Sequence, residues 1–135
     1  RKLFGGAMRQ AGIIAAGALH ALRHHVDRLA EDHDNARRLG EAIRNINGLQ
    51  LRPDQVETNL VIFQVDPALG AAAEFATRLG EAGVLVIPFG SNLIRAVTHL
   101  DVSREEIDRA CQIFAEVAKQ ASGGAGTTES TSAYA

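Results

Sequence analysis

The chain has 135 residues, of which 46% are hydrophobic and 22% charged, with a formal net charge of −2. Such a chain forms one globular domain with a core of its own. The small net charge gives no reason to expect nucleic acid or an anionic membrane as a partner, and charged residues or glycines interrupt every apolar run before the roughly 20 residues that a membrane span needs. The single cysteine, Cys111, excludes an internal disulfide and favours the cytoplasm.

The first ten residues combine cations, a glycine pair and a predicted helix start. Gly5 and Gly6 allow backbone conformations closed to other residues and let another group approach closely. The apolar run that follows predicts a helix from Met8 to Leu22, which places Arg9 in its first turn, at the positive end of the helix dipole. Lys2, Arg9 and free N–H groups are therefore a candidate site for a phosphate or carboxylate. The alternative is a solvated arginine at a frayed helix end.

The predicted helix at residues 8–22 has almost no polar face, because alanine, glycine, isoleucine and leucine fill it. A helix that is apolar all round is buried on all sides. A domain of this size can hardly surround such a helix, so we expect it to contact another domain or another subunit. The alternative is a central helix of this domain.

Four histidines follow closely, at positions 20, 24, 25 and 33. His20 and His24 share a helix face. No glutamate follows His20 as in a zinc-protease helix, and no cysteine or carboxylate cluster supplies a third ligand. The sequence therefore predicts surface or capping histidines and no metal site.

The rest of the chain alternates between the helical period and the strand period. A helix from Val26 to Ile46, ended by Asn47 and Gly48, is either separate from the first helix or one long helix with it, bent near residues 24–26. The later predictions are strands at 49–51 and 58–65, a helix at 71–82, a strand at 84–87 stopped by Pro88, a strand at 93–98 and a helix from Ser103 to about Ala121. This order predicts an α/β or α+β domain, a small sheet covered by helices.

The last helix carries a clear start signal. Ser103 at the N-cap and Glu106 three residues later form a capping box. Beyond Ala121, glycine, serine, threonine and alanine dominate, so residues 122–135 have too little apolar surface to offset their ordering entropy. We expect a disordered tail there.

Arg95 is the second candidate site residue. It lies within the predicted strand at 93–98, where alternation gives it one face with Leu93, Val97 and His99. A charge among such neighbours needs a partner, and arginine binds a carboxylate through two parallel hydrogen bonds. The alternative is an edge-strand arginine that reaches water or pairs with Glu81 or Asp101. We assign His99 a structural role.

Two runs resemble one enzyme family. The run R-K-x-x-G-G-x-M-R-Q-A-G at residues 1–12 resembles the segment that opens the C-terminal region of low-specificity L-threonine aldolases. The run R-A-V-T-H-L-D-V at residues 95–102 resembles a second signature of these enzymes, and the order and separation of the two runs also fit. The resemblance covers residues 1 to about 121.

This resemblance implies a pyridoxal-phosphate enzyme of the aspartate-aminotransferase-like fold, also called fold type I. Such enzymes cleave the Cα–Cβ bond of L-threonine, allo-threonine and related β-hydroxy-α-amino acids, giving glycine and an aldehyde. The implied setting is cytoplasmic threonine catabolism and glycine biosynthesis by a homotetramer. Arg95 would hold the substrate α-carboxylate, and Lys2 and Arg9 would lie near the cofactor.

The resemblance also implies a division of the chain. Residues 1–25 would be an interface helix linked to a large domain, residues 26–121 the C-terminal small domain and residues 122–135 the tail. Neither Lys2 nor Lys119 matches the family's cofactor lysine, so we expect a C-terminal fragment that contains no catalytic residue and is inactive alone. The alternatives are a serine hydroxymethyltransferase-like or β-eliminating enzyme of the same fold, and a non-catalytic α/β dimerisation module.

Overall fold

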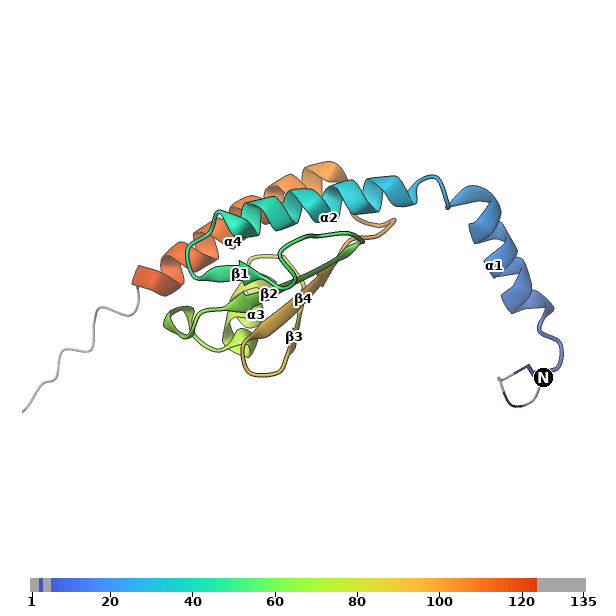
Figure 1. Cartoon of the computed structure of the whole chain (residues 1–135), viewed down its shortest axis with the longest axis horizontal. Coiled ribbons are helices and arrows are strands. Elements are labelled where there is room, and N and C mark those ends of the chain that lie inside the picture. The colour runs from blue at the N-terminus through green and yellow to red at the C-terminus, as the bar shows by residue number, and fades with distance from the viewer. Residues whose placement is uncertain (1–2, 4–5, 124–135) are drawn as a thin grey trace, which may run out of the picture. The chain divides into compact units, whose positions relative to one another are not determined.

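A computed structural model describes residue 3 and residues 6–123 of the chain. The chain divides into two compact units, residues 1–31 and residues 32–135, and each is described by itself. Figure 1 labels the helices and strands of both. Among the residues described, no helix is long and apolar enough to cross a membrane.

The first unit contains helix α1, which runs from Gly12 to His24. The predicted start at Met8 is wrong, and Arg9 lies before the helix and not in its first turn. The physical reason is Gln10, whose φ of 53° is a left-handed conformation that a right-handed helix cannot contain. Ala11 then takes the N-cap position without a side-chain hydrogen bond. The chain leaves the helix again after His24, so α1 and the next helix are separate.

The surface of α1 is apolar, and none of its residues is buried within the described part of the chain. Ile13 is 89% exposed and Leu22 is 70% exposed. Apolar surface of this kind is the usual mark of an interaction site. Helix α1 therefore has the composition of a buried helix, although none of its residues is buried by the part of the chain that the structure describes.

The second unit is built on a four-stranded antiparallel sheet with the order β1-β2-β4-β3. Its elements are α2 (Leu29–Arg44, of which residues 32–44 belong to this unit), β1 (Leu49–Leu51), β2 (Leu60–Val65), the short 3-10 helix η2 (Pro67–Leu69), α3 (Ala72–Glu81), β3 (Ile87–Phe89), β4 (Leu93–Val97) and α4 (Arg104–Gly123). The strands β2 and β4 form the centre of the sheet.

One face of the sheet is buried. Strand alternation places Val61, Phe63, Ile94 and Ala96 on this face, and the register pairs Phe63 with Ile94 and Val61 with Ala96. Three helices cover them, each with an apolar stripe. Figure 1 shows α2 and α4 running along the same side of the sheet, and the core includes α3 through Phe75 and its neighbours. Among the described residues of this unit, no helix covers the other face.

The edge strand β3 differs from the prediction. The expected strand at residues 84–87, stopped by Pro88, is wrong: the observed strand runs from Ile87 to Phe89 and contains Pro88. A proline lacks the N–H that an inner strand must donate, but an edge strand has one side without a partner strand. Val84 instead donates its N–H to the Leu79 carbonyl at 2.8 Å, which continues the end of α3.

The predicted signals at element ends are confirmed. Glu106 accepts from the Ser103 N–H at 2.8 Å, and its own N–H donates to Ser103 Oγ at 3.3 Å, so the capping box is present. Gly48 adopts a φ of +87° after the end of α2, as the Asn47–Gly48 stop predicts. The last helix reaches Gly123, past the predicted end, and the expected tail from residue 124 onward lies outside the described residues.

Candidate functional site

The face of the sheet opposite the core holds the candidate site. Its strand positions follow from the register and the alternation of side chains, and only one of them is charged. They are Gln50, Leu60, Ile62, Gln64, Ile87, Phe89, Leu93, Arg95 and Val97. Arg95 is therefore the one cation among the strand positions of this face. Arg52, just after β1, reaches the same face through its hydrogen bonds to Gln50 and Gln64.

Arg95 lies in a central strand of the sheet. The residues directly opposite it are Ile62 on β2 and Ile87 on β3. Its side chain is exposed, and it makes no hydrogen bond or ion pair with any part of the chain that the structure describes. The strand is not an edge strand, because β3 pairs with that side of β4, and Asp101 lies close to His99. The exposed side chain does reach water, as the alternative held.

The surroundings of Arg95 are apolar and only partly covered. Leu60 is 44% exposed, Ile87 53%, Phe89 41% and Val97 40%. A guanidinium presents a planar fork of donors that fits a carboxylate. Apolar neighbours cannot neutralise it, so the arrangement favours an anionic group from outside this unit.

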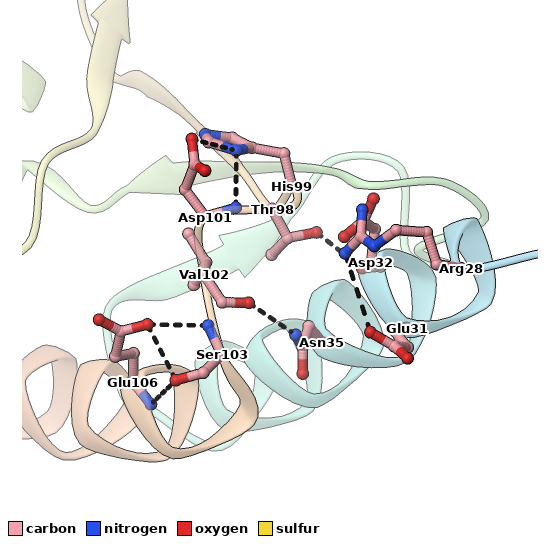
Figure 2. A network of polar contacts seen from close by, with 10 residues as sticks. All are labelled: Arg28, Glu31, Asp32, Asn35, Thr98, His99, Asp101, Val102, Ser103 and Glu106. Carbon is pink, nitrogen blue, oxygen red and sulfur yellow. Dashed lines mark hydrogen bonds and ion pairs between the residues drawn. The ribbon is translucent and has the colours of Figure 1, made fainter. Parts of the chain in front are cut away.

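The strand that carries Arg95 is fixed at its end by Thr98. The Thr98 hydroxyl is buried and donates to the Asp32 carbonyl of α2 at 2.6 Å (Figure 2). Its backbone N–H donates to the Asn59 carbonyl at 3.0 Å, and the Asn59 side-chain amide donates to the Thr98 carbonyl at 2.8 Å. The end of β4 is therefore bound to both the first helix of the unit and the start of β2.

The residues after Thr98 form a hydrogen-bonded turn, visible in Figure 2. The Asp101 N–H donates to His99 Nδ1 at 3.3 Å, and the Asp101 carboxylate lies 3.4 Å from the same atom. The Val102 carbonyl accepts from the Asn35 side-chain amide at 3.2 Å. The geometry gives His99 a place in this turn, in keeping with the structural role expected for it.

The capping box completes the turn and affects one ionisation. Hydrogen bonds from the Ser103 N–H and hydroxyl stabilise the charged carboxylate of Glu106, so they lower its pKa below its ordinary value of 4.5. Within residues 95–106, strand β4 thus carries one exposed cation. The buried Thr98 hydroxyl and the capping box of Ser103 and Glu106 hold the strand in place.

The other predicted site residues, Lys2 and Arg9, do not belong to the unit that contains Arg95. Arg9 is exposed and lies in the first unit, before α1, whereas Arg95 belongs to the second unit. Lys2 lies outside the described residues. The geometry within the units therefore supports a site at Arg95 and leaves the roles of Lys2 and Arg9 as predictions.

The histidines of α1 cluster without forming a metal site. The ring centroids of His20 and His24 are 4.5 Å apart, and those of His20 and His25 are 5.4 Å apart. Within residues 3 and 6–123, no group of three histidine, cysteine, aspartate or glutamate side chains is placed to hold a metal ion. Cys111 is half-buried, and burial raises the pKa of its thiol, which makes it a poor nucleophile.

Known proteins resemble this chain in sequence. A family model described as β-eliminating lyase matches residues 1–66. A probable low-specificity L-threonine aldolase 2 of Arabidopsis thaliana is 38% identical over 119 residues, which are 87% of this chain and 33% of that protein. The low specificity L-threonine aldolase of Escherichia coli K12 is 42% identical over 109 residues, 79% of this chain and 30% of that protein.

The chain is similar in sequence to the low-specificity L-threonine aldolases. The resemblance predicted from its two sequence runs is confirmed. The chain spans about a third of the length of the curated relatives that it matches. A more distant relative with the same name, from Candida albicans, is 29% identical over 116 residues, 86% of this chain and 29% of that protein.

Two solved structures share the fold. The structure of MppP soaked with the product 2-ketoarginine has a TM-score of 0.56 at 16% identity, over 69% of this chain and 28% of that one. Plasmodium falciparum ornithine delta-aminotransferase has a TM-score of 0.53 at 15% identity, over 66% of this chain and 24% of that one. The predicted fold class is confirmed: the chain is an α/β domain with the fold of part of a fold-type I enzyme.

Sequence reasoning missed the two isoleucines opposite Arg95. The strand of Ile62 was predicted and that of Ile87 was misplaced, and the residue that faces Arg95 depends on the register between strands. It also missed the hydrogen bond from Thr98 to Asp32. A threonine at the end of an apolar strand was the available signal, and its partner is 66 positions away in the sequence.

Proposed function

We propose that this chain is the carboxylate-binding part of a pyridoxal-phosphate-dependent lyase that acts on β-hydroxy-α-amino acids. The reaction breaks the Cα–Cβ bond of L-threonine or L-allo-threonine and yields glycine and acetaldehyde. The names of the relatives and the β-eliminating lyase family model support a lyase. Assembly as a homotetramer, the cytoplasmic location and the place in threonine catabolism and glycine synthesis are part of the same proposal.

The observation that carries the proposal is the unneutralised guanidinium of Arg95 on the open face of the sheet. Every α-amino acid has a carboxylate that this fork can bind, and so does the product glycine. The strand beneath it is fixed by Thr98 and by the core face, so the backbone that carries the fork has a defined position before substrate arrives. Arg95 orients the substrate and takes no part in proton transfer.

The described residues do not form a complete binding site for the cofactor. Lys119 is the one lysine among the described residues, and it is exposed on α4. Arg9 is exposed as well. When bound, pyridoxal phosphate supplies the electron sink for this chemistry. Its anchoring lysine belongs to a part of the enzyme other than this chain, and Lys2 and Arg9 are the residues here that we assign to its vicinity.

The exposed apolar surface of α1 supports the same proposal. In the complete enzyme we assign this helix, within residues 1–25, to an interface with a large domain or another subunit. The small domain, predicted at residues 26–121, extends to Gly123, where α4 ends. The tail that we propose therefore begins after residue 123. This division explains why so apolar a helix has no buried residue in its own unit.

A graft tests the proposal directly. Residues 1–121 replace the matching part of the E. coli relative, and the hybrid is assayed for acetaldehyde released from L-threonine. We expect cleavage by the hybrid and none by this chain alone. With pyridoxal phosphate and borohydride, the chain alone should show no stoichiometric label at Lys2 or Lys119. A folded hybrid without activity, or turnover by the labelled chain, would contradict the proposal.

The match to the β-eliminating lyase model supports a second candidate, a lyase that eliminates a β-substituent. The products distinguish the two. Retro-aldol cleavage gives glycine and an aldehyde, whereas β-elimination gives ammonia and a keto acid. Assaying the hybrid for both product pairs, with L-threonine and L-serine as substrates, decides between them.

A further inference from the structure

We infer that Ile62 and Ile87 are positioning residues for Arg95: they flank its aliphatic stem, reduce the water around it and so strengthen its grip on a carboxylate. This inference rests on the proposed carboxylate-binding role of Arg95. It concerns residues outside both sequence runs that resemble the aldolases, at 1–12 and 95–102.

The register places the two isoleucines on either side of the arginine. Ile62 of β2 and Ile87 of β3 are the direct cross-strand partners of Arg95. Directly opposite residues have Cβ atoms about 4.5–5.5 Å apart and share one face of the sheet. The aliphatic stem of Arg95 therefore rises between two branched apolar side chains.

Branching at Cβ suits these residues to a positioning role. Isoleucine in a strand has a restricted χ1 angle, so its side chain does not move aside easily. An arginine stem between two such side chains loses alternative rotamers and keeps its charged head above the apolar surface. The entropy of ordering the fork is then spent before the ligand binds.

The same neighbours strengthen the electrostatic attraction. The energy of an ion pair varies inversely with the effective dielectric constant, which falls where apolar groups displace water. No carboxylate among the described residues neutralises Arg95. Apolar side chains beside the stem thus displace part of the water around an available cation, whose side chain stays exposed.

The closing experiment measures binding at Arg95 in this chain. L-Threonine is titrated while the Arg95 side-chain Nε–Hε signal is followed by NMR, with L-threoninol as the carboxylate-free control. We expect Ile62→Thr and Ile87→Thr each to weaken L-threonine binding about fivefold, since a wetter site raises the effective dielectric constant. Both variants should also increase the sensitivity of binding to sodium chloride.

Two further variants serve as controls. Leu60→Thr changes the same open face at a position that pairs with Val97 and not with Arg95, and Leu60 is about as exposed as Ile87. It should change the dissociation constant by less than about twofold. Ile87→Val keeps an apolar, β-branched side chain and should retain the wild-type affinity and salt dependence. The backbone amide spectrum verifies that each variant is folded.

The outcomes distinguish the positioning role of the two isoleucines from the carboxylate-binding role of Arg95. Equal affinities for the threonine variants at positions 60, 62 and 87, with wild-type binding intact, would overturn the positioning role and leave the carboxylate role standing. A wild-type Arg95 signal that does not respond to L-threonine, or responds equally to L-threoninol, would overturn the carboxylate role and the positioning role with it.

Discussion

The two faces of strand β4 differ in almost every physical respect. Ile94 is fully buried and Ala96 is 6% exposed, whereas Arg95 between them is exposed to solvent. The buried face holds the strand through the core and through the Thr98 hydrogen bond. The open face presents a charge with no partner in the described chain. Alternation along one strand thus places a rigid support and a recognition group at adjacent residues.

The largest effect is expected on the buried face. Phe63 is fully buried and meets Phe114 edge to face, with ring centroids 5.5 Å apart. Phe63→Ala should lower the free energy of unfolding by about 3–5 kcal/mol through lost burial and the cavity left behind. Urea unfolding monitored by circular dichroism measures it. Gln64→Ala, one position along on the open face, is the control, and equal losses for both would contradict the comparison.

On the open face the expected loss is in activity and not in stability. In the grafted aldolase, Arg95→Ala should lower kcat/KM by an amount equivalent to about 2–5 kcal/mol, because the substrate carboxylate loses its partner. Arg95→Lys should rescue poorly, since it keeps the charge without the fork. The urea midpoint should stay at the wild-type value.

Arg52 provides the matched control for Arg95. It is an exposed arginine that donates to the Gln64 side chain on the same face at 3.1 Å. Arg52→Ala should leave kcat/KM close to wild type. If both arginine variants lose activity alike, the open face acts through its general charge and Arg95 has no special position.

The Thr98 hydrogen bond connects the two faces and should have an intermediate effect. Thr98→Val keeps the shape but leaves the buried Asp32 carbonyl without this donor, which should cost about 1–3 kcal/mol of unfolding free energy. Thr77→Val is the control, because the Thr77 hydroxyl donates to the Ala73 carbonyl at 2.9 Å on an exposed helix surface. A loss for Thr98→Val no larger than for Thr77→Val would show that the buried bond does not support the strand.

The smallest effect concerns pH. The pKa of Glu106 is lowered by its hydrogen bonds from Ser103, so its charged form is favoured in the folded state. This contribution is present above the unfolded pKa and is lost as pH falls through the folded pKa. Glu106→Gln should therefore be less stable than wild type at neutral pH, with a difference that shrinks in acid.

Glu105→Gln is the control for the pH prediction. Glu105 lies in the same helical turn but does not take part in the capping box. Its substitution should leave the acid limb of the stability curve close to wild type. Thermal unfolding from neutral to acidic pH measures both variants, and identical pH dependences would refute the assignment to the capping box.

The sequence predicted the features that depend on near neighbours in the chain. The capping box, the Gly48 stop and the helix stripes are all local patterns, and each is present in the structure. Arg95 was visible as a charge in an apolar strand. Its setting was not, because the residues beside it come from other strands and the register between strands is a tertiary property.

Two predictions made from local sequence patterns are wrong, the start of α1 and the bounds of β3. The start of α1 was placed too early because the left-handed backbone of Gln10 leaves no mark in the hydrophobic pattern. The strand containing Pro88 was placed too early because proline is a strand breaker in the interior of a sheet but not at its edge. In each case the backbone had a conformation that composition alone does not fix.

Pro88 also affects how this chain can pair with other chains. It is the central residue of the three that form β3, at an edge of the sheet and next to the apolar open face. An edge with free N–H groups is a template on which a second chain can add strands and begin to aggregate. Proline has no N–H to offer there, so the edge nearest the exposed apolar side chains is a poor seed for cross-β growth.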